Sequence, residues 1–151
     1  MKTLSSARDL AEIRTRIAQV AASDAPRWGS MSAAGMLCHL RDALSCPLGE
    51  RVPAAVKPPS IPLPLYKWLA LRLPVKWPPG VPTPPEMDQR IGGTQPVDFE
   101  QDRAALLVKL DQFACSAGPW APHPMFLAMT SADWMRWGYL HCDHHLRQFG
   151  R

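Results

Sequence analysis

Apolar residues recur at intervals of three and four positions in four stretches of the chain, and this period predicts four amphipathic helices. We place them from about Arg8 to Ala22, from about Ala33 to Ser45, from Asp98 to near Ser116, and over Trp134–Phe149. We find no credible β-strand between them. The pattern therefore predicts an all-α fold in which four helices surround one core.

Polar residues directly before the apolar stripes support the predicted helix starts. Ser6, Ser32, Asp98 and Thr130 are all side chains that favour the N-cap position, because their oxygen atoms can accept a hydrogen bond from the first helical turn. Thr130 is followed three positions later by Asp133, which is the spacing of a capping box. These residues fix where each helix begins more sharply than periodicity alone.

Between the second and third predicted helices, residues 47–97 contain most of the seventeen prolines of the chain. Proline cannot continue a helix and pushes the preceding residue to extended geometry, as expected at Pro58-Pro59. One short helix fits at about residues 65–73. We interpret the segment as a crossover that is either a lid on the bundle or, through Tyr66-Lys67-Trp68-Leu69, a surface that docks a partner or a membrane.

Composition narrows the class of protein. The chain of 151 residues is 46% hydrophobic and 20% charged, which predicts a single globular domain over residues 1–151. Its net charge of +4 is dispersed, so we expect no nucleic-acid partner, and no stretch reaches the roughly 20 apolar residues of an integral membrane segment. Four cysteines without CxxC spacing and an N-terminus without signal-peptide character predict free thiols and a cytoplasmic location.

The last predicted helix carries the main chemical clue. On a helical wheel Arg136, Asp143 and Arg147 point in one direction, which we expect to face water. His141 and His145 lie one turn apart on the opposite side, where the apolar stripe should be. Buried imidazoles need polar partners, and a shared metal ion would satisfy both. A surface pair of histidines at this spacing can also arise by chance.

A third ligand would have to come from a facing helix, and His39 on the second helix is the available imidazole. On that helix we expect Cys38, Arg41 and Asp42 to face solvent, with His39 on the flank of the buried side. Three histidine ligands leave coordination positions open, as in catalytic rather than structural metal sites. The sequence therefore predicts a metal site made by His39, His141 and His145.

Four further residues are placed around this site or in its pocket. His144 projects to the flank of the last helix and is assigned a position beside the ligands. Cys142 lies close to the side of that helix that carries His141 and His145. A structural zinc site made of cysteines and histidines, with Cys38 and Cys142 among its ligands, is therefore a remaining alternative. His123, between two prolines, is interpreted as a loop anchor rather than a catalytic residue. Trp134 is interpreted as a core or interface aromatic.

Two groups of residues resemble the DinB/YfiT superfamily of metalloenzymes. The first comprises Trp28-Gly29-Ser30-Met31-Ser32 and Met36-Leu37-Cys38-His39-Leu40. The second comprises His123-Pro124-Met125-Phe126, Met129-Thr130, Trp134 and the terminal run from His141 to Phe149. Together they look like an uncharacterised DinB-like branch, whereas the proline-rich middle of the chain carries no such resemblance.

The resemblance implies a four-helix bundle in up-down-down-up order, with a divalent metal, zinc or nickel, on His39, His141 and His145. It also implies a small-molecule substrate, in some relatives a low-molecular-weight thiol, and a homodimer in many. We therefore hold two hypotheses. In the first, the chain is a metal-dependent enzyme, either a thiol-dependent transferase or a hydrolase. In the second, it is a non-enzymatic binding protein on the same scaffold.

Overall fold

The computed structural model describes residues 1–54, 56, 60–80 and 83–151. Over these residues the chain forms five α-helices and a short 3-10 helix, with no β-strand. The elements are α1 (Ala7–Ala18), α2 (Ala33–Ser45), α3 (Leu63–Arg72), η1 (Pro85–Met87), α4 (Phe99–Cys115) and α5 (Ser131–Gln148). The prediction of an all-α fold is confirmed for this part of the chain. The expected geometry at Pro58-Pro59 lies outside the described residues.

The predicted capping residues begin the four long helices. The side chains of Ser6, Ser32, Asp98 and Thr130 each accept a hydrogen bond from a backbone N–H in the first turn of α1, α2, α4 and α5. Thr130 forms the complete capping box, because the Asp133 carboxylate also accepts from the Thr130 backbone N–H. These local contacts explain why helix starts were predicted to within a few residues.

The first helix is shorter than predicted, because it ends at Ala18 and not near Ala22. The Asp24 carboxylate accepts a hydrogen bond from the Ala21 backbone N–H and also pairs with Arg151. These contacts hold the chain after Gln19 in a turn that a continuing helix could not form. A stripe of apolar residues alone did not reveal this competing interaction.

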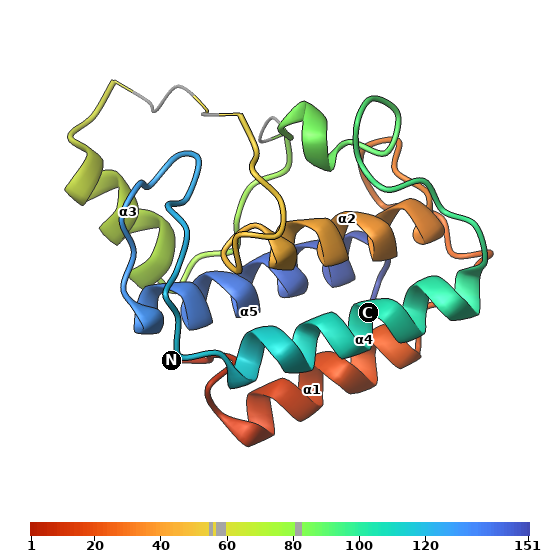
Figure 1. Ribbon diagram of the computed structural model, residues 1–151. Helices are drawn as coiled ribbons and strands as arrows, with labels where there is room; N and C mark the ends of the chain where they lie inside the picture. Colours follow the sequence, from red (N-terminus) through yellow and green to blue (C-terminus); the bar gives the residue numbers. More distant parts are fainter. Residues whose placement is uncertain (55, 57–59, 81–82) are drawn as a thin grey trace.

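The four long helices lie side by side, with α1 and α4 below α2 and α5 in Figure 1. The closest packing joins α2 to α4 and α1 to α5, and contacts also join α1 to α4 and α2 to α5. The core between them is built from Ile13, Ile17, Met36, Leu40, Leu106, Leu110, Phe113, Trp134 and Leu146, all fully buried. Helix α3 lies outside this group and packs on α5.

Two expectations about α2 are wrong. Cys38 and Asp42 were expected to face solvent, but they are only 1% and 3% exposed. The reason is that α2 is covered on several sides, by α4, by α5 and by the returning crossover at η1. A helical wheel gives the direction of a side chain, but it does not tell how many neighbours surround the helix.

The expected wet face of α5 is also partly wrong. Asp143 and Arg147 are half-buried and pair with each other, but Arg136 is buried. Its guanidinium donates to the Leu71 carbonyl oxygen at 2.9 Å and to the Lys2 carbonyl oxygen at 2.7 Å. Arg136 thus satisfies carbonyl groups at the end of α3 and in the N-terminal segment, which is how a buried cation avoids a large desolvation cost.

The crossover is tied to the helices by charged contacts. Asp42 of α2 accepts from the backbone N–H and hydroxyl of Thr94 at 2.7 and 2.6 Å, and it pairs with Arg51 at 3.2 Å. At the other end of the molecule, Asp133 pairs with Lys67 and Arg72 of α3. These contacts hold both halves of the crossover against the helices, and α3 begins and ends within two residues of the predicted 65–73.

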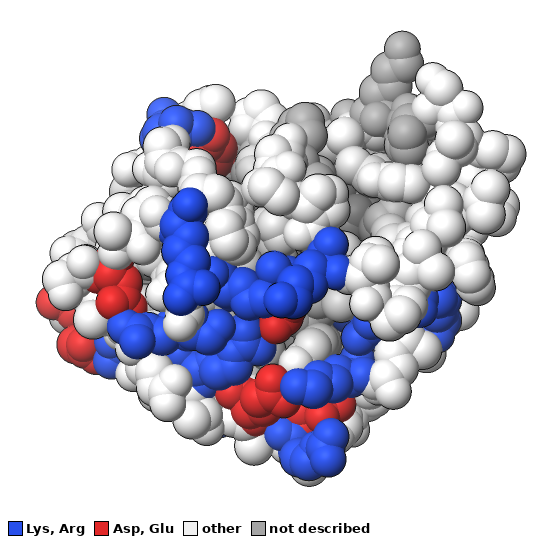
Figure 2. Space-filling view, turned by 180° about the vertical axis from the view of Figure 1, so that it is seen from behind, with Lys and Arg blue, Asp and Glu red and all other residues white. Residues whose placement is uncertain are grey.

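Lysine and arginine side chains gather on the face opposite that of Figure 1, with acidic side chains among them (Figure 2). Many cations of the described residues are paired: Lys2 with Glu12, and both Arg16 and Arg147 with Asp143. The positive charge is therefore largely neutralised locally. Among the described residues, no helix is both long and apolar enough to cross a membrane.

Candidate metal centre

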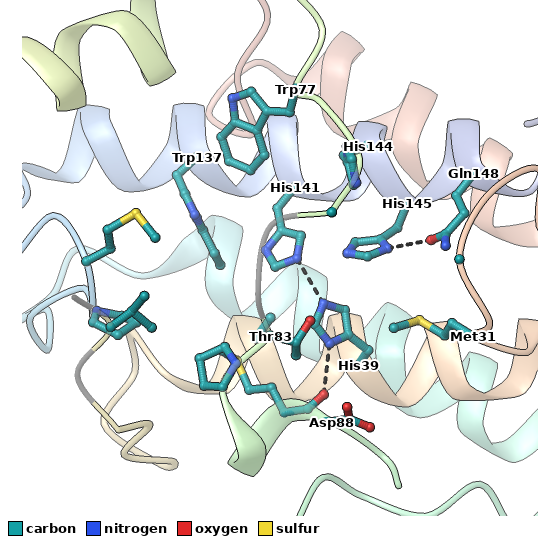
Figure 3. Close-up of a pocket in the computed structure, with 18 of the residues that line it drawn as sticks. Met31, His39, Trp77, Thr83, Asp88, Trp137, His141, His144, His145 and Gln148 are labelled. Atoms are coloured by element: carbon teal, nitrogen blue, oxygen red, sulfur yellow. Dashed lines mark hydrogen bonds between the residues drawn. The ribbon is translucent and has the colours of Figure 1, made fainter. Parts of the chain in front are cut away.

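Three histidines from two helices meet inside the helical assembly. His39 of α2 and His141 and His145 of α5 each offer a ring nitrogen, and these three atoms lie within 4.8 Å of one another. The Nε2 atoms of His39 and His141 are 3.0 Å apart, and Figure 3 shows all three rings turned toward a common point. The residues that the sequence predicts as ligands are brought together in a geometry that is close enough to hold a metal ion.

The tautomer of His39 is set by the crossover. Its Nδ1 lies 2.9 Å from the Met87 carbonyl oxygen, which can only accept a hydrogen bond. The ring proton must therefore be on Nδ1, which leaves the Nε2 lone pair free and directed at His141. Such a carbonyl partner behind a ligating histidine is the usual arrangement in protein metal sites, because it orients the ring and raises its basicity.

The orientation of His145 is set by Gln148 and, through it, by Trp28. The Gln148 amide nitrogen donates to the Trp28 carbonyl oxygen at 2.8 Å, so its amide oxygen must face the other way, toward His145 Nδ1 at 2.9 Å. That oxygen accepts the Nδ1 proton, and the lone pair of His145 Nε2 is again free. Figure 3 shows this contact beside the histidine cluster.

All three rings are in the protonation state that metal binding needs. Burial lowers the pKa of His39, and it lowers the pKa values of His141 and His145 well below the ordinary range, with the neighbouring imidazoles as a further cause. The rings are consequently neutral near pH 7, and neutral imidazole is the ligating form. A group of three neutral nitrogen donors suits zinc, nickel or a similar transition metal.

The described residues do not satisfy the hydrogen-bonding capacity of every ring nitrogen in the cluster. Among the described residues, His39 Nε2 has one hydrogen-bond partner, His141 Nε2 at 3.0 Å, and His145 Nε2 has none. His141 Nδ1 is also buried without a hydrogen-bond partner among the described residues. A cation can accept the Nε2 lone pairs of both His39 and His145. The donor set therefore fits a divalent metal ion.

The histidine cluster opens into a cavity of about 1060 Å³. This is the size of ordinary ligand pockets. The described lining is mostly aromatic and aliphatic and comes from α2, α3, α5, the crossover and the loop before α5; it includes Trp28, Met31, Tyr66, Leu69, Trp77, Met87, Phe126 and Trp137. A ligand in this space would have its polar end at the three imidazoles and its body against apolar walls.

Of the two residues predicted beside the ligands on α5, one lines the cavity and one does not. The His144 ring lies against Trp28 and His145, with centroids 5.6 and 5.1 Å away, so it packs beside the cluster without joining it. Cys142 is fully buried, and burial raises the pKa of its thiol to about 12. It is not among the described residues that line the cavity.

The Cys/His alternative is not favoured by the structure. Burial also raises the pKa of Cys38, to about 11, which disfavours the thiolate that a metal ligand requires. Among the described residues, the cluster that could hold an ion contains three histidines and no cysteine. We therefore assign the candidate site to imidazoles alone.

His123 and Trp134 both line the cavity. His123 Nδ1 accepts hydrogen bonds from the backbone N–H groups of Met125 and Phe126, each at 3.1 Å, which confirms its interpretation as a loop anchor. The Trp134 ring lies in the core, 5.2 Å from Trp137 and 5.4 Å from His123. These aromatic contacts make one rigid wall of the cavity.

Sequence reasoning missed the residues that orient the ligands. Met87 contributes a backbone carbonyl, which carries no side-chain signal. Gln148 lies three residues after His145, on the same helical face, so its spacing contained a signal that we did not use. Asp88, which Figure 3 places near the cluster, follows a 3-10 turn in the proline-rich segment that sequence periodicity could not locate.

The buried His123 should make the metal-free protein acid-sensitive. Burial lowers its pKa to about 3, whereas in the unfolded chain the value is the ordinary one near 6.5. The unfolded state therefore binds a proton between these values that the folded state does not, and stability falls as the pH falls below about 6.5. For this group the slope is about 1.4 kcal/mol per pH unit.

The expected result is a shallower pH dependence in a His123→Asn variant, because asparagine keeps an acceptor for the loop but does not titrate. Urea unfolding at pH 7, 6 and 5, with a chelator present in every sample, measures the difference between variant and wild type. Parallel pH curves for the two proteins would contradict the assignment.

Comparisons with known proteins give one partial match. The model of a family described as a protein of unknown function (DUF1569) matches residues 78–151, just under half of the chain. The matched part contains α4, α5, His141 and His145, but not His39. Neither the search of curated proteins nor that of solved structures gives a match. The similarity therefore adds no activity, and the geometry of the site carries the functional argument.

Proposed function

We propose that this protein binds a divalent transition metal, zinc or nickel, through His39, His141 and His145. The observation that carries the proposal is the convergence of three imidazoles, those of the buried His39 and the partly buried His141 and His145. Two of them have their Nδ1 protons fixed by Met87 and Gln148. Fixed protons on Nδ1 leave lone pairs on Nε2 in a common direction. Exposed histidine clusters that form by chance have no reason to show this.

We further propose the up-down-down-up bundle of the DinB-like class, within one domain over residues 1–151. Three observations support it: α2 packs most extensively on α4, α1 packs on α5, and the crossover of 47–97 joins α2 to α4. A long crossover allows α2 and α4 to run parallel. This arrangement would place His39 opposite the two histidines of α5, so fold and site support each other.

The function that this site supports best is that of a metal-dependent enzyme, a transferase or hydrolase acting on a small molecule. When bound, the ion supplies Lewis acidity, which lowers the pKa of a coordinating nucleophile. The protein residues would orient the three imidazoles and exclude bulk water through the aromatic walls. A low-molecular-weight thiol as co-substrate and a homodimer are proposals that come from the resemblance alone. A cytoplasmic location is a proposal that rests on the cysteine spacing and the N-terminal sequence.

Metal analysis of protein purified without a histidine tag tests the proposal. We expect about one equivalent of zinc or nickel in the wild type and a clear loss in His39→Ala and His145→Ala, because each variant removes one of three donors. Exchange into a chelator and back-titration with zinc excludes loss during purification. A metal content below about a tenth of an equivalent per protein, with no zinc uptake and no effect of either substitution, would contradict the proposed metal site.

The second candidate function is that of a non-enzymatic binding protein. It is favoured by one observation, the exposure of Trp68 (53%) and Leu65 on the outer side of α3. The same helix is nevertheless held on α5 by Asp133, and its Leu71 is buried in the core, which supports a lid instead. Metal uptake without turnover of any thiol-transfer or hydrolysis substrate would favour this second function.

A further inference from the structure

The loop before α5 is built around His123. The backbone N–H of His123 donates to the Leu127 carbonyl oxygen at 2.8 Å, and the Leu127 N–H donates back at 2.9 Å. Leu127 has a φ of 57°, a left-handed conformation that costs a branched L-residue about 1 kcal/mol or more. This closed turn directs the N–H groups of Met125 and Phe126 at the imidazole.

The turn determines which ring nitrogen of His123 carries the proton. Nδ1 accepts from two backbone N–H groups and cannot be protonated, so the proton of the neutral ring is on Nε2. The residue is only 8% exposed, and its ring lines the cavity. Nε2–H has no hydrogen-bond partner among the described residues. The loop thus holds this N–H donor rigidly at the cavity wall, and anchoring the loop needs only Nδ1.

The surroundings of this donor are aromatic. The His123 ring stacks on Phe126 with centroids 4.6 Å apart, and Trp137 lies 5.4 Å from His123 and 4.7 Å from His141. Trp137 therefore stands between His123 and the histidine cluster. Since the two are separated by one indole, a ligand of modest length could contact both.

The charges that line the cavity indicate which kind of hydrogen-bond acceptor can bind to His123 Nε2–H. The basic side chains among the described lining residues are Lys76 and Arg90; both are exposed, and Arg90 pairs with Asp88. The aromatic rings around His123 bring no cation with them. A carboxylate would be costly to bury without a cation, whereas a neutral carbonyl oxygen needs only one donor.

We propose that His123 is a specificity-determining residue whose Nε2–H donates to a neutral carbonyl oxygen of an apolar ligand in the cavity. The substrate class is thus an aromatic or aliphatic ketone, ester or amide, with its body against Trp137. The inference rests on the proposed function in so far as it takes this cavity as the substrate chamber. A neutral imidazole in this position polarises a carbonyl group without giving up its proton.

Two matched probes test the proposal: 4-phenylbutan-2-one and the hydrocarbon in which a methylene group replaces its carbonyl oxygen. We expect the wild type to bind the ketone about fivefold more tightly, because one buried neutral hydrogen bond distinguishes the two. Quenching of tryptophan fluorescence measures both affinities, with and without zinc. The preference should persist without the metal, so failure of the metal site and failure of this inference are separable.

His123→Asn is the matched variant, because its amide oxygen is as far along the side chain as Nδ1 and can still accept from the loop. It should bind both probes equally and keep the wild-type zinc content. As a measurement on the unaltered protein, the ¹⁵N resonance of His123 Nε2 should shift with the ketone and not with the hydrocarbon. Equal affinities in the wild type, no binding of either probe, or an unmoved Nε2 resonance would each overturn the proposal.

Discussion

A Gln148→Leu variant should bind zinc about 10- to 100-fold more weakly than the wild type, although it keeps all three candidate ligands. Leucine has nearly the volume of glutamine but cannot accept the His145 Nδ1 proton or donate to the Trp28 carbonyl. The imidazole would lose both its fixed orientation and part of its basicity. Competition with a chromophoric chelator measures the affinity.

The control for this variant is Gln101→Leu, the same change at an exposed position of α4, which should leave zinc affinity unaltered. A double variant distinguishes an effect through His145 from a general loss of structure. If Gln148 acts through that ring, Gln148→Leu should weaken zinc binding little further once His145 is alanine. Wild-type affinity in the single variant would show that Gln148 does not support the site.

Asp42→Ala should lower the free energy of unfolding by about 3 kcal/mol. The substitution removes a buried carboxylate and leaves the Thr94 N–H, the Thr94 hydroxyl and the Arg51 guanidinium without their shared acceptor. This loss of unfolding free energy is near the lower end of the range expected when a buried ion pair is broken, because Arg51 retains some access to water. Urea unfolding of the metal-free protein measures it.

Asp111→Ala is the matched control. Asp111 pairs with Arg14, but its side chain is 48% exposed, so its removal should cost less than about 1 kcal/mol. The contrast between the two variants tests burial and not charge alone. A loss at Asp42 no larger than that at Asp111 would mean that the crossover is not held by this carboxylate.

The helices of this protein could be predicted from sequence because their signals are local. N-cap residues such as Ser32 and Thr130 act within one turn, and the spacing of His141 and His145 is a property of a single helix. His39 was selected as the third candidate because it was the available imidazole on another helix. The resemblance named the same three residues.

What could not be predicted depends on neighbours that are distant in sequence. Asp42 is buried because Thr94 returns to it, and Arg136 is buried because the Leu71 and Lys2 carbonyls need a donor. Each polar residue was read as facing water, since the partner that makes burial tolerable was not visible. The contact of the Met87 carbonyl with His39 is even harder to predict, because every residue has a backbone carbonyl and the sequence does not show which one is used.

The position of Met87 has a consequence for how the protein responds to its metal. Its carbonyl fixes His39 only while the crossover is docked, and docking depends in turn on Asp42. Thermodynamic coupling is reciprocal, so whatever stabilises the docked segment raises metal affinity by the same factor that the metal stabilises docking. In the proposed site, docking of the proline-rich crossover and binding of the ion thus stabilise each other.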